Sequence, residues 1–307
     1  MVIGSLLKPK LWVTLASLAF IAVALVHQGE QLRQINLEPR GWWLLLLGLG
    51  VTWLSILING LAWRLLLDWL GQRPPGVALV PLFVRSNLLK YLPGGIWHLV
   101  ERVRRLRPAI GAGPALAGVI LDPLLIVAAA SLLMLVGGWQ HGLLLLLAPI
   151  PSLVLLLPRL REPVLRRLER TKAAQLQAAG SGDLPVDGSG RGGAPWLPLA
   201  AQMVFVLIRF AGFACCLAAF DLNTPAAGQW LAAFALAYAA GLVVPGAPGG
   251  LGVFEATLLL RLGVSVDEAS LLAVVLSYRV ISTLADLLAA AVLAADQALM
   301  QRLRPVP

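Results

Sequence analysis

Long uninterrupted apolar runs restrict the fold of this chain more than any other feature. One of them, Gly41–Leu70, contains only Arg64 and Asp68 as charged residues. About 20 apolar residues cross the hydrocarbon core of a bilayer as a helix. In hydrocarbon, every backbone polar group must be hydrogen-bonded within the protein, so spanning segments are helices or closed barrels. Because the runs are continuous rather than alternating, we predict an all-α, polytopic integral membrane helix bundle.

Composition agrees with this class and narrows the partners. Of the 307 residues, 59% are hydrophobic and 13% are charged, whereas soluble domains carry about 25% charged residues. The formal net charge is +9, but the basic residues lie between apolar runs. The positive-inside rule and anionic headgroups explain them there, so we expect a membrane environment and no nucleic-acid partner. The two cysteines are adjacent and the three histidines isolated, so no disulfide, metal site or cofactor is predicted.

The apolar runs and one polar stretch divide the chain into two halves of a single membrane domain, residues 1–307. Leu11–Val26 follows Lys8 and Lys10 as a signal peptide would, but it lacks a clean cleavage site, so we predict a retained first helix. Residues 158–195 begin as a basic, amphipathic segment and continue as a Gly/Ser/Pro-rich linker. The first half is 10–157 and the second 196–301. Further spans are expected at Gly41–Leu70, Ala115–Val136, Leu143–Leu157, Trp196–Phe220 and Ala269–Met300.

The distribution of lysine and arginine predicts the orientation. Basic residues concentrate at both termini, in 102–107 and in 158–195, and these segments are expected to be cytoplasmic. The connections 137–142, 221–228 and 263–268 contain no lysine or arginine and are expected outside. The chain is therefore predicted to be a multi-pass protein of the plasma (inner) membrane with its N- and C-termini in the cytoplasm.

Two Pro-Gly-Gly breaks interrupt apolar surroundings, in YLPGGIWH (91–98) and APGGLGVFE (247–255). On the predicted orientation, residues 77–107 begin and end inside, whereas residues 228–262 begin and end outside. Each half then reads as helix, broken hairpin, helix, and the two halves have opposite topology. Either break is alternatively a kink, or a short loop between two full crossings. Paired interrupted segments in inverted halves point to the binding site of a transporter.

Candidate binding residues come from the breaks and from charges inside apolar runs. A helix that starts after a break leaves free N–H groups that favour an anion, and ionisable residues within the membrane are functional candidates by default. Internal ion pairing is the alternative for these charges, including Asp122 and Asp286, and Glu101 is interpreted as an interfacial anchor. The predicted site for an anionic lipid headgroup consists of Pro93, Gly94, Gly95, Pro248, Gly249, Gly250, Gly252, Glu255, Arg209, Arg279, Arg85 and Lys90, with no catalytic or metal-binding residue.

The two break motifs also carry a family resemblance. NLLKYLPGGIWHLVER and VVPGAPGGLGVFE resemble the flippase-like family related to the membrane domain of lysylphosphatidylglycerol synthase, over roughly residues 10–300. The second motif, with Pro248, Gly252 and Glu255, is the more specific. The first departs from the commoner family form, in which a Gly-Glu pair closely follows the break, because Gly-Gly-Ile-Trp-His stands there in this sequence. The soluble aminoacyl-transferase domain of the synthase is absent, so the resemblance implies lipid translocation rather than lysyl transfer.

The functional expectation is a flippase-like transporter that moves a phospholipid, glycolipid or polyprenyl-phosphate-type lipid between leaflets, and not an enzyme, because no catalytic motif is found. The alternative is a membrane-embedded enzyme or an accessory subunit in envelope lipid or glycan assembly, with an envelope-synthesis enzyme as partner. A structural scaffold is a third possibility, and a homo-oligomer is compatible with each.

Overall fold

The computed structural model describes residues 37–92, 95–141, 147–178, 193–222, 225–244, 250, 252–263 and 265–303. The predicted first helix, Leu11–Val26, lies outside the described residues. Within the described part the chain is all-α, and four of its helices are long and apolar enough to cross a membrane. The prediction of a polytopic membrane helix bundle is therefore confirmed. These four helices are α2 (Pro39–Trp69), α5 (Ala112–Leu133), α9 (Trp196–Ala219) and α12 (Glu268–Leu303).

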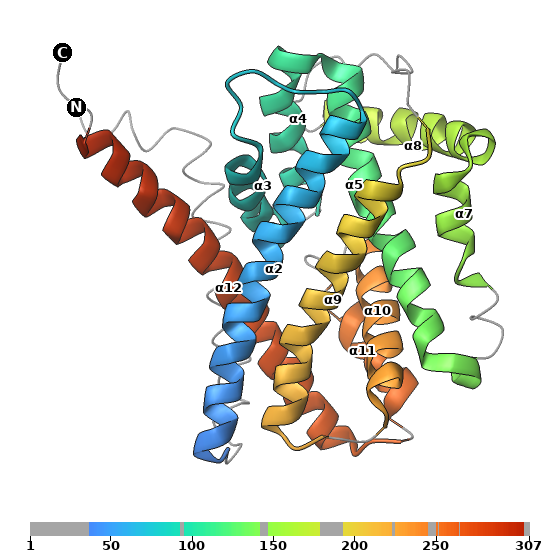
Figure 1. Ribbon diagram of the computed structural model, residues 1–307, viewed down its shortest axis with the longest axis vertical. Helices are drawn as coiled ribbons and strands as arrows, with labels where there is room; N and C mark the ends of the chain where they lie inside the picture. Colours follow the sequence, from blue (N-terminus) through green and yellow to red (C-terminus); the bar gives the residue numbers. More distant parts are fainter. Residues whose placement is uncertain are drawn as a thin grey trace.

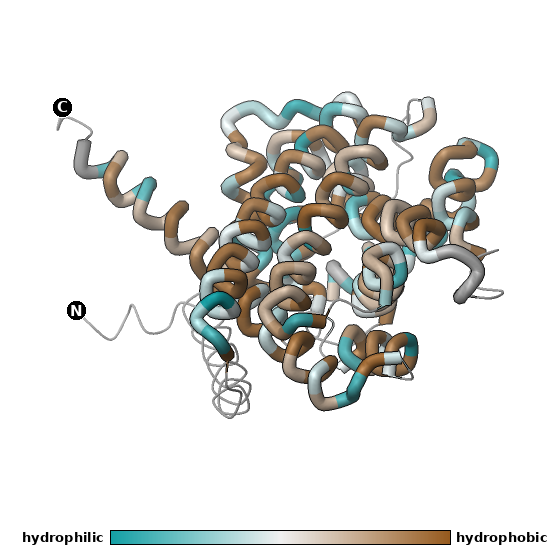
Figure 2. Tube along the Cα trace, turned by 60° about the horizontal axis from the view of Figure 1, so that its bottom comes forward, coloured by the Kyte–Doolittle hydropathy of each residue, from teal (hydrophilic) through white to brown (hydrophobic). Residues whose placement is uncertain are grey.

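The distribution of hydrophobic residues along the long helices agrees with a membrane bundle. Figure 2 shows mostly hydrophobic residues along the long helices, with hydrophilic residues gathered toward their ends. The exposed residues of α2 include Trp42, Trp43 and Leu46, each more than half exposed. Large apolar side chains on the outside of a soluble protein are a liability, but on a membrane bundle they face lipid.

Two broken helical hairpins lie between the long helices, one in each half. In the first hairpin, α3 (Leu79–Asn87) and the short 3-10 helix η2 (Leu88–Tyr91) precede the bend and α4 (Trp97–Ile110) follows it. In the second hairpin, the bend separates α10 (Ala227–Val243) from α11 (Val253–Leu262). At 1.5 Å per residue the longest arm, α10, measures about 26 Å. Each arm is therefore too short to cross a hydrocarbon core of about 30 Å, which favours re-entrant hairpins over two full crossings.

The hairpins enter the bundle from opposite ends. Figure 1 shows the first hairpin at the end that carries helix α8 (Pro158–Ala178), whereas α10 rises from the opposite end and α11 returns toward it. Packing repeats this inversion. Helix α2 packs along α9; α5 packs against α9 as α12 packs against α2; and α10 contacts α5 as α3 contacts α12. The two halves thus form an inverted repeat in their contacts as well as in their order of elements.

Small residues allow α2 and α9 to approach closely at the centre of this arrangement. A side chain at Gly48 would meet the backbone oxygen of Gly212 at 3.1 Å, and one at Gly41 would meet that of Ala219 at 3.0 Å. Lipid tails are as apolar as leucine, so helices in membranes associate through close packing rather than through the hydrophobic effect. The glycines therefore fix the contact between the two halves.

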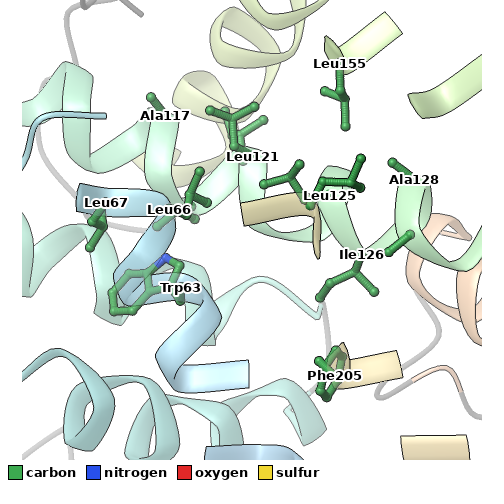
Figure 3. Close-up of a cluster of buried hydrophobic side chains, with 14 of the residues drawn as sticks. Trp63, Leu66, Leu67, Ala117, Leu121, Leu125, Ile126, Ala128, Leu155 and Phe205 are labelled. Atoms are coloured by element: carbon green, nitrogen blue, oxygen red, sulfur yellow. The ribbon is translucent and has the colours of Figure 1, made fainter. Parts of the chain in front are cut away.

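The largest buried cluster joins α2, α5 and α9, as Figure 3 shows. Trp63 of α2 is fully buried there, and its Nε1 donates a hydrogen bond to the carbonyl oxygen of Gly118 on α5 at 3.1 Å. Leu121, Leu125 and Phe205 complete the contact from α5 and α9. This cluster supports the long helices against which the hairpins rest.

One expectation for the middle of the chain needs correction. Leu143–Leu157 is not one continuous helix, because a turn at Ala148–Pro149 precedes the seven-residue helix α7 (Ile150–Leu156), and proline cannot continue a helical hydrogen-bond ladder. The basic segment after it forms a helix, α8, which is amphipathic as predicted, with one face exposed and the other packed. It packs against α5 and α7 and buries Arg161, Leu165 and Glu169 at helical spacing. Met134–His141 forms the 3-10 helix η3.

Candidate functional site

A cavity of about 330 Å³ lies inside the bundle, and both hairpin bends contribute to its wall. Gly95 comes from the first bend and Gly250 from the second, and the long helices add Asp122, Arg209 and Arg279. Residues more than 150 positions apart in sequence therefore meet at one place, as the paired breaks predict. Pro93, Gly94, Pro248 and Gly249 lie outside the described residues.

Glycine is required at both bends by the backbone conformation. Gly95, Gly250 and Gly252 have φ values of 64°, 72° and 82°, in the left-handed region that costs other residues about 1–2 kcal/mol. Gly250 has a second constraint, because a side chain there would meet the Cα of Gly241 at 3.2 Å. The second bend is consequently pressed against α10, while nothing lies within 4 Å of a side chain placed at Gly95.

Asp286 of α12 links the second half to the tip of the first hairpin. Its carboxylate accepts hydrogen bonds from Lys90 Nζ at 2.6 Å, Tyr91 Oη at 2.7 Å and Asn87 Nδ2 at 2.7 Å. Asp286 is 2% exposed, so these donors replace the water that a buried carboxylate needs. We call this group the Asp286 cluster; it is an ion-paired contact between the two halves.

Glu255 and Arg279 form the corresponding pair at the second hairpin. The Arg279 guanidinium donates to both carboxylate oxygens of Glu255 and, at 2.7 Å, to the carbonyl oxygen of Gly250. It also lies over the ring of Phe254 at 4.9 Å. Glu255 sits in the first turn of α11, where a carboxylate interacts favourably with the helix dipole. The start of α11 is therefore occupied by an acid of the chain itself, which supports the internal-pairing interpretation for these two residues.

A third buried pair, Arg102 with Asp122, joins α4 to α5. Arg102 Nη1 lies 3.3 Å from Asp122 Oδ2, and Gln202 of α9 donates to the other carboxylate oxygen at 2.9 Å. Arg102 also donates to Ser86 Oγ at 2.9 Å, and its guanidinium lies 3.8 Å from the centre of the Phe83 ring. Both charges are at most 3% exposed, so the pair holds the first hairpin against its own half.

Arg102 is buried, unlike the exposed Arg104 and Arg105 beside which it lies in the predicted basic cluster, and the sequence contains a signal for this burial. At helical spacing, Arg102 lies on the same face as Leu99 and Leu106, next to Val103, whereas Arg104 points away and is exposed. Counting basic residues in a short segment ignores this periodicity. Reading 97–110 as an amphipathic helix separates one inward-facing arginine from its exposed neighbours.

Unlike Lys90, Arg102 and Arg279, Arg209 has no carboxylate within ion-pair distance among the described residues. It lies midway along α9, lines the cavity and is 6% exposed. Its Nη1 donates to Ser55 Oγ at 3.2 Å, while its Nε has no hydrogen-bond partner in the described part of the chain. The Tyr278 ring lies 6.0 Å from the guanidinium. A buried charge without a counter-ion is costly, which marks Arg209 as the functional candidate of the cavity.

Other polar atoms at the cavity are also left for a ligand or water. Asn59 Oδ1 and His98 Nδ1 belong to lining residues and have no partner within the described ranges. His98 lies in the first turn of α4, which begins without a side-chain cap and without an acid in that turn. Lys172 of α8 reaches the cavity wall from one end of the bundle. Unlike the start of α11, the start of α4 faces the cavity without an acid of its own.

Two acidic or basic candidates lie away from this site. Arg85 is exposed, contacts the carbonyl oxygen of Leu293 at 3.5 Å and does not line the cavity. Glu101 pairs with Arg105, one turn along α4, at 2.8 Å on the outer part of that helix. Glu101 is therefore not the structural counterpart of Glu255.

Comparison with known proteins places the whole bundle in one family. Residues 10–290 match the model of the family described as the lysylphosphatidylglycerol synthase transmembrane region. This match covers both hairpins and every residue that lines the cavity. A search of curated proteins finds no match for the chain.

Proposed function

Because this chain belongs to the lysylphosphatidylglycerol synthase transmembrane-region family, we propose that it moves a phosphate-bearing lipid between the two leaflets of the plasma membrane. The observation that carries the proposal is the cavity at which two opposed re-entrant hairpins meet, with Arg209 buried in its wall. Transporters built from inverted repeats place their substrate site at such a junction of interrupted helices, near the middle of the membrane. A headgroup phosphate in this cavity would supply the counter-charge that Arg209 lacks.

Movement of the two halves relative to each other would open the site to one leaflet and then to the other. In the proposed cycle, one half rocks against the other around the closely packed α2–α9 contact. The Asp286 cluster holds the first hairpin to α12, so this contact would have to loosen when the first hairpin moves. A phosphate near Arg209 would compete with Asp286 for Lys90, since both cations line the cavity. Lipid binding and the movement of the hairpin would then be coupled.

Orientation in the membrane is part of the same proposal. Exposed arginines of α4 and α8, including Arg104, Arg105 and Arg166, lie at one end of the bundle (Figure 1). Asp221 and Asp267 lie in connections at the opposite end. By the positive-inside rule, this distribution supports a cytoplasmic α8 end, with the C-terminal end of α12 on the same side.

Lipid movement by the purified chain tests the proposal directly. The full chain is reconstituted in liposomes that contain acyl-labelled fluorescent phospholipids, and dithionite bleaches the label in the outer leaflet. We expect bleaching to proceed beyond the outer-leaflet fraction in proteoliposomes but not in protein-free vesicles. An unrelated membrane protein at the same density is the control for leakage and scrambling. No movement above these controls across a broad panel of anionic lipids would overturn the proposal, and lipid binding without movement would favour the accessory-subunit alternative.

A further inference from the structure

Positive charge is in excess at the cavity, and the excess lies at Arg209. Three ion pairs lie at the cavity or beside it, Lys90 with Asp286, Arg102 with Asp122, and Arg279 with Glu255. Arg209 also lines the cavity, but it has no acid within ion-pair distance among the described residues. The cavity therefore presents an uncompensated positive charge at Arg209.

The acids at the cavity are not available to a cationic ligand. Asp286 already accepts three hydrogen bonds from the first hairpin. Asp122 accepts from Arg102 and Gln202 on its two oxygens. Both oxygens of Glu255 are bonded by Arg279. A headgroup amine would therefore have to displace an internal cation, and it would add a positive charge to a cavity that already has an uncompensated one at Arg209.

Two further features of the cavity also favour an anionic ligand. Lys172 contributes a further positive charge from α8, where its Nζ donates to Gln175 Oε1 at 3.1 Å. The start of α4 points its helix dipole at the cavity without an acid in the first turn. A phosphate approached by Arg209 would thus meet favourable electrostatics on more than one side. Arginine also suits phosphate because its planar fork binds two oxygens at once.

From these observations we infer that the cavity selects lipids whose headgroup carries a net negative charge, with Arg209 as the phosphate ligand, and that it discriminates against cationic headgroups such as aminoacylated ones. The inference rests on the proposed function and specifies its substrate class. A phosphate supplies the negative charge that Arg209 lacks, and it brings no positive charge of its own into the cavity. A zwitterionic lipid offers the same phosphate but brings an amine for which the described cavity has no free acid.

A competition experiment in detergent separates this inference from lipid transport. A fluorescent short-chain phosphatidylglycerol is bound to the full chain, and unlabelled phosphatidylglycerol, phosphatidylcholine and lysyl-phosphatidylglycerol are used to displace it. We expect phosphatidylglycerol to compete at least about tenfold better than phosphatidylcholine, and lysyl-phosphatidylglycerol to compete least. Equal competition by the three lipids, or the reverse order, would overturn the inference.

Variants identify the residue responsible. Arg209→Gln should weaken phosphatidylglycerol binding about tenfold and reduce its advantage over phosphatidylcholine, whereas Arg209→Lys should retain part of it. Arg104→Gln removes the same charge from an exposed position of α4 and should leave the order of lipids unchanged. A folded Arg209→Gln protein with full selectivity would refute the assignment. If Arg209→Gln does not fold, the wild-type order of competition and the Arg209→Lys variant still decide the outcome.

The transport assay distinguishes the two proposals. Selective, Arg209-dependent binding without any movement of lipid in liposomes would refute the transport function and leave the headgroup selectivity standing. Movement of anionic and cationic lipids at equal rates would refute the headgroup selectivity and leave the transport function standing.

Discussion

The two hairpins look equivalent in sequence but hold their charges in different ways. In the second hairpin, Glu255, Arg279 and the carbonyl oxygen of Gly250 bond to one another, and the acid occupies the start of α11. In the first hairpin, Lys90 bonds to Asp286 of the other half, and the start of α4 has no acid in its first turn. The second hairpin is thus tied to its own half, while the first is tied across the interface between the halves.

This difference suggests a division of roles. A hairpin that is neutralised within its own half provides a fixed wall for the cavity. A hairpin that is held by an ion pair to the opposite half is the one whose position depends on the relation between the halves. Rocking of the halves would therefore disturb the Asp286 cluster before it disturbed the Glu255–Arg279 pair.

The largest expected effect comes from breaking the Asp286 cluster. Asp286→Asn removes the charge that compensates Lys90, and loss of one partner of a buried pair costs about 3–5 kcal/mol. The free energy of unfolding in mixed micelles is the measurement. The matched control is Asp68→Asn, which removes an aspartate from the solvent-exposed pair with Arg73 and should cost less than about 1 kcal/mol.

A double variant tests whether charge is the cause. Replacing the pair with apolar residues, as Lys90→Met with Asp286→Leu, should be less destabilising than Asp286→Asn alone, because it leaves no unpaired charge on Lys90. Equal losses for Asp286→Asn and Asp68→Asn would show that the cluster does not hold the halves together.

The next effect compares the two bends directly. Gly95 and Gly250 both have a positive φ, so an alanine at either position is strained by about 1–2 kcal/mol. Only at Gly250 would the added carbon also press on backbone, at Gly241 Cα, 3.2 Å away. We therefore expect Gly250→Ala to destabilise by about 1–3 kcal/mol more than Gly95→Ala, as measured by unfolding in mixed micelles. Equal losses at the two positions would mean that the second bend is not packed more tightly than the first.

A smaller effect is expected for the pair inside the second hairpin. Glu255 and Arg279 side chains are 18% and 13% exposed, so solvent screens them partly, and Glu255→Gln or Arg279→Gln should each cost about 1–3 kcal/mol. The double variant should lose less than the sum of the two. Arg279→Gln frees Glu255 and should therefore narrow the advantage of phosphatidylglycerol over phosphatidylcholine, but by less than Arg209→Gln does. A change in headgroup selectivity as large as that of Arg209→Gln would show that this pair binds the ligand as well.

Much of the fold could be predicted because membrane helices obey local rules. A span is predicted at Trp196–Phe220, and the structure has a helix at Trp196–Ala219. The two agree because the length of the apolar run is enough to define such a segment. The two breaks were found through proline and glycine, and their inverted arrangement through lysine and arginine counts. The prediction of one span over Leu143–Leu157 was wrong, because its apolar length predicts a helix but its prolines interrupt one. The helix described within this range has seven residues.

The site was predictable only in part, because its chemistry depends on contacts that are distant in sequence. Charges inside apolar runs identified Lys90, Arg209, Glu255 and Arg279, all of which belong to the cavity or its ion pairs. The sequence ranked 248–255 above the first break, since that motif is the more specific. It could not show that Glu255 is neutralised locally while Arg209 is not, because partner choice depends on how helices some 24 to 199 positions apart come together.

The smallest effect concerns the connection that follows the second hairpin. Asp267 precedes α12 and caps it, since its Oδ2 accepts hydrogen bonds from the backbone N–H and the hydroxyl of Ser270, both at 2.9 Å. These hydrogen bonds lower the pKa of Asp267 below its ordinary value. A carboxylate whose pKa is lowered on folding stabilises the protein above its unfolded-state pKa, about 3.9. That contribution is lost as the pH falls through the lower, folded-state pKa.

Asp267→Ala should therefore lower the melting temperature slightly at pH 7, and the difference from wild type should shrink as the pH falls below about 4. Comparing the two proteins at each pH cancels the titration of the other carboxylates. Glu268→Ala, which removes a neighbouring charge but no such cap, is the control and should show no comparable pH dependence. A difference that stays constant between pH 7 and pH 3 would mean that the ionised carboxylate does not act as the cap. The start of α12, and with it the support for the Glu255–Arg279 pair, would then depend on packing alone.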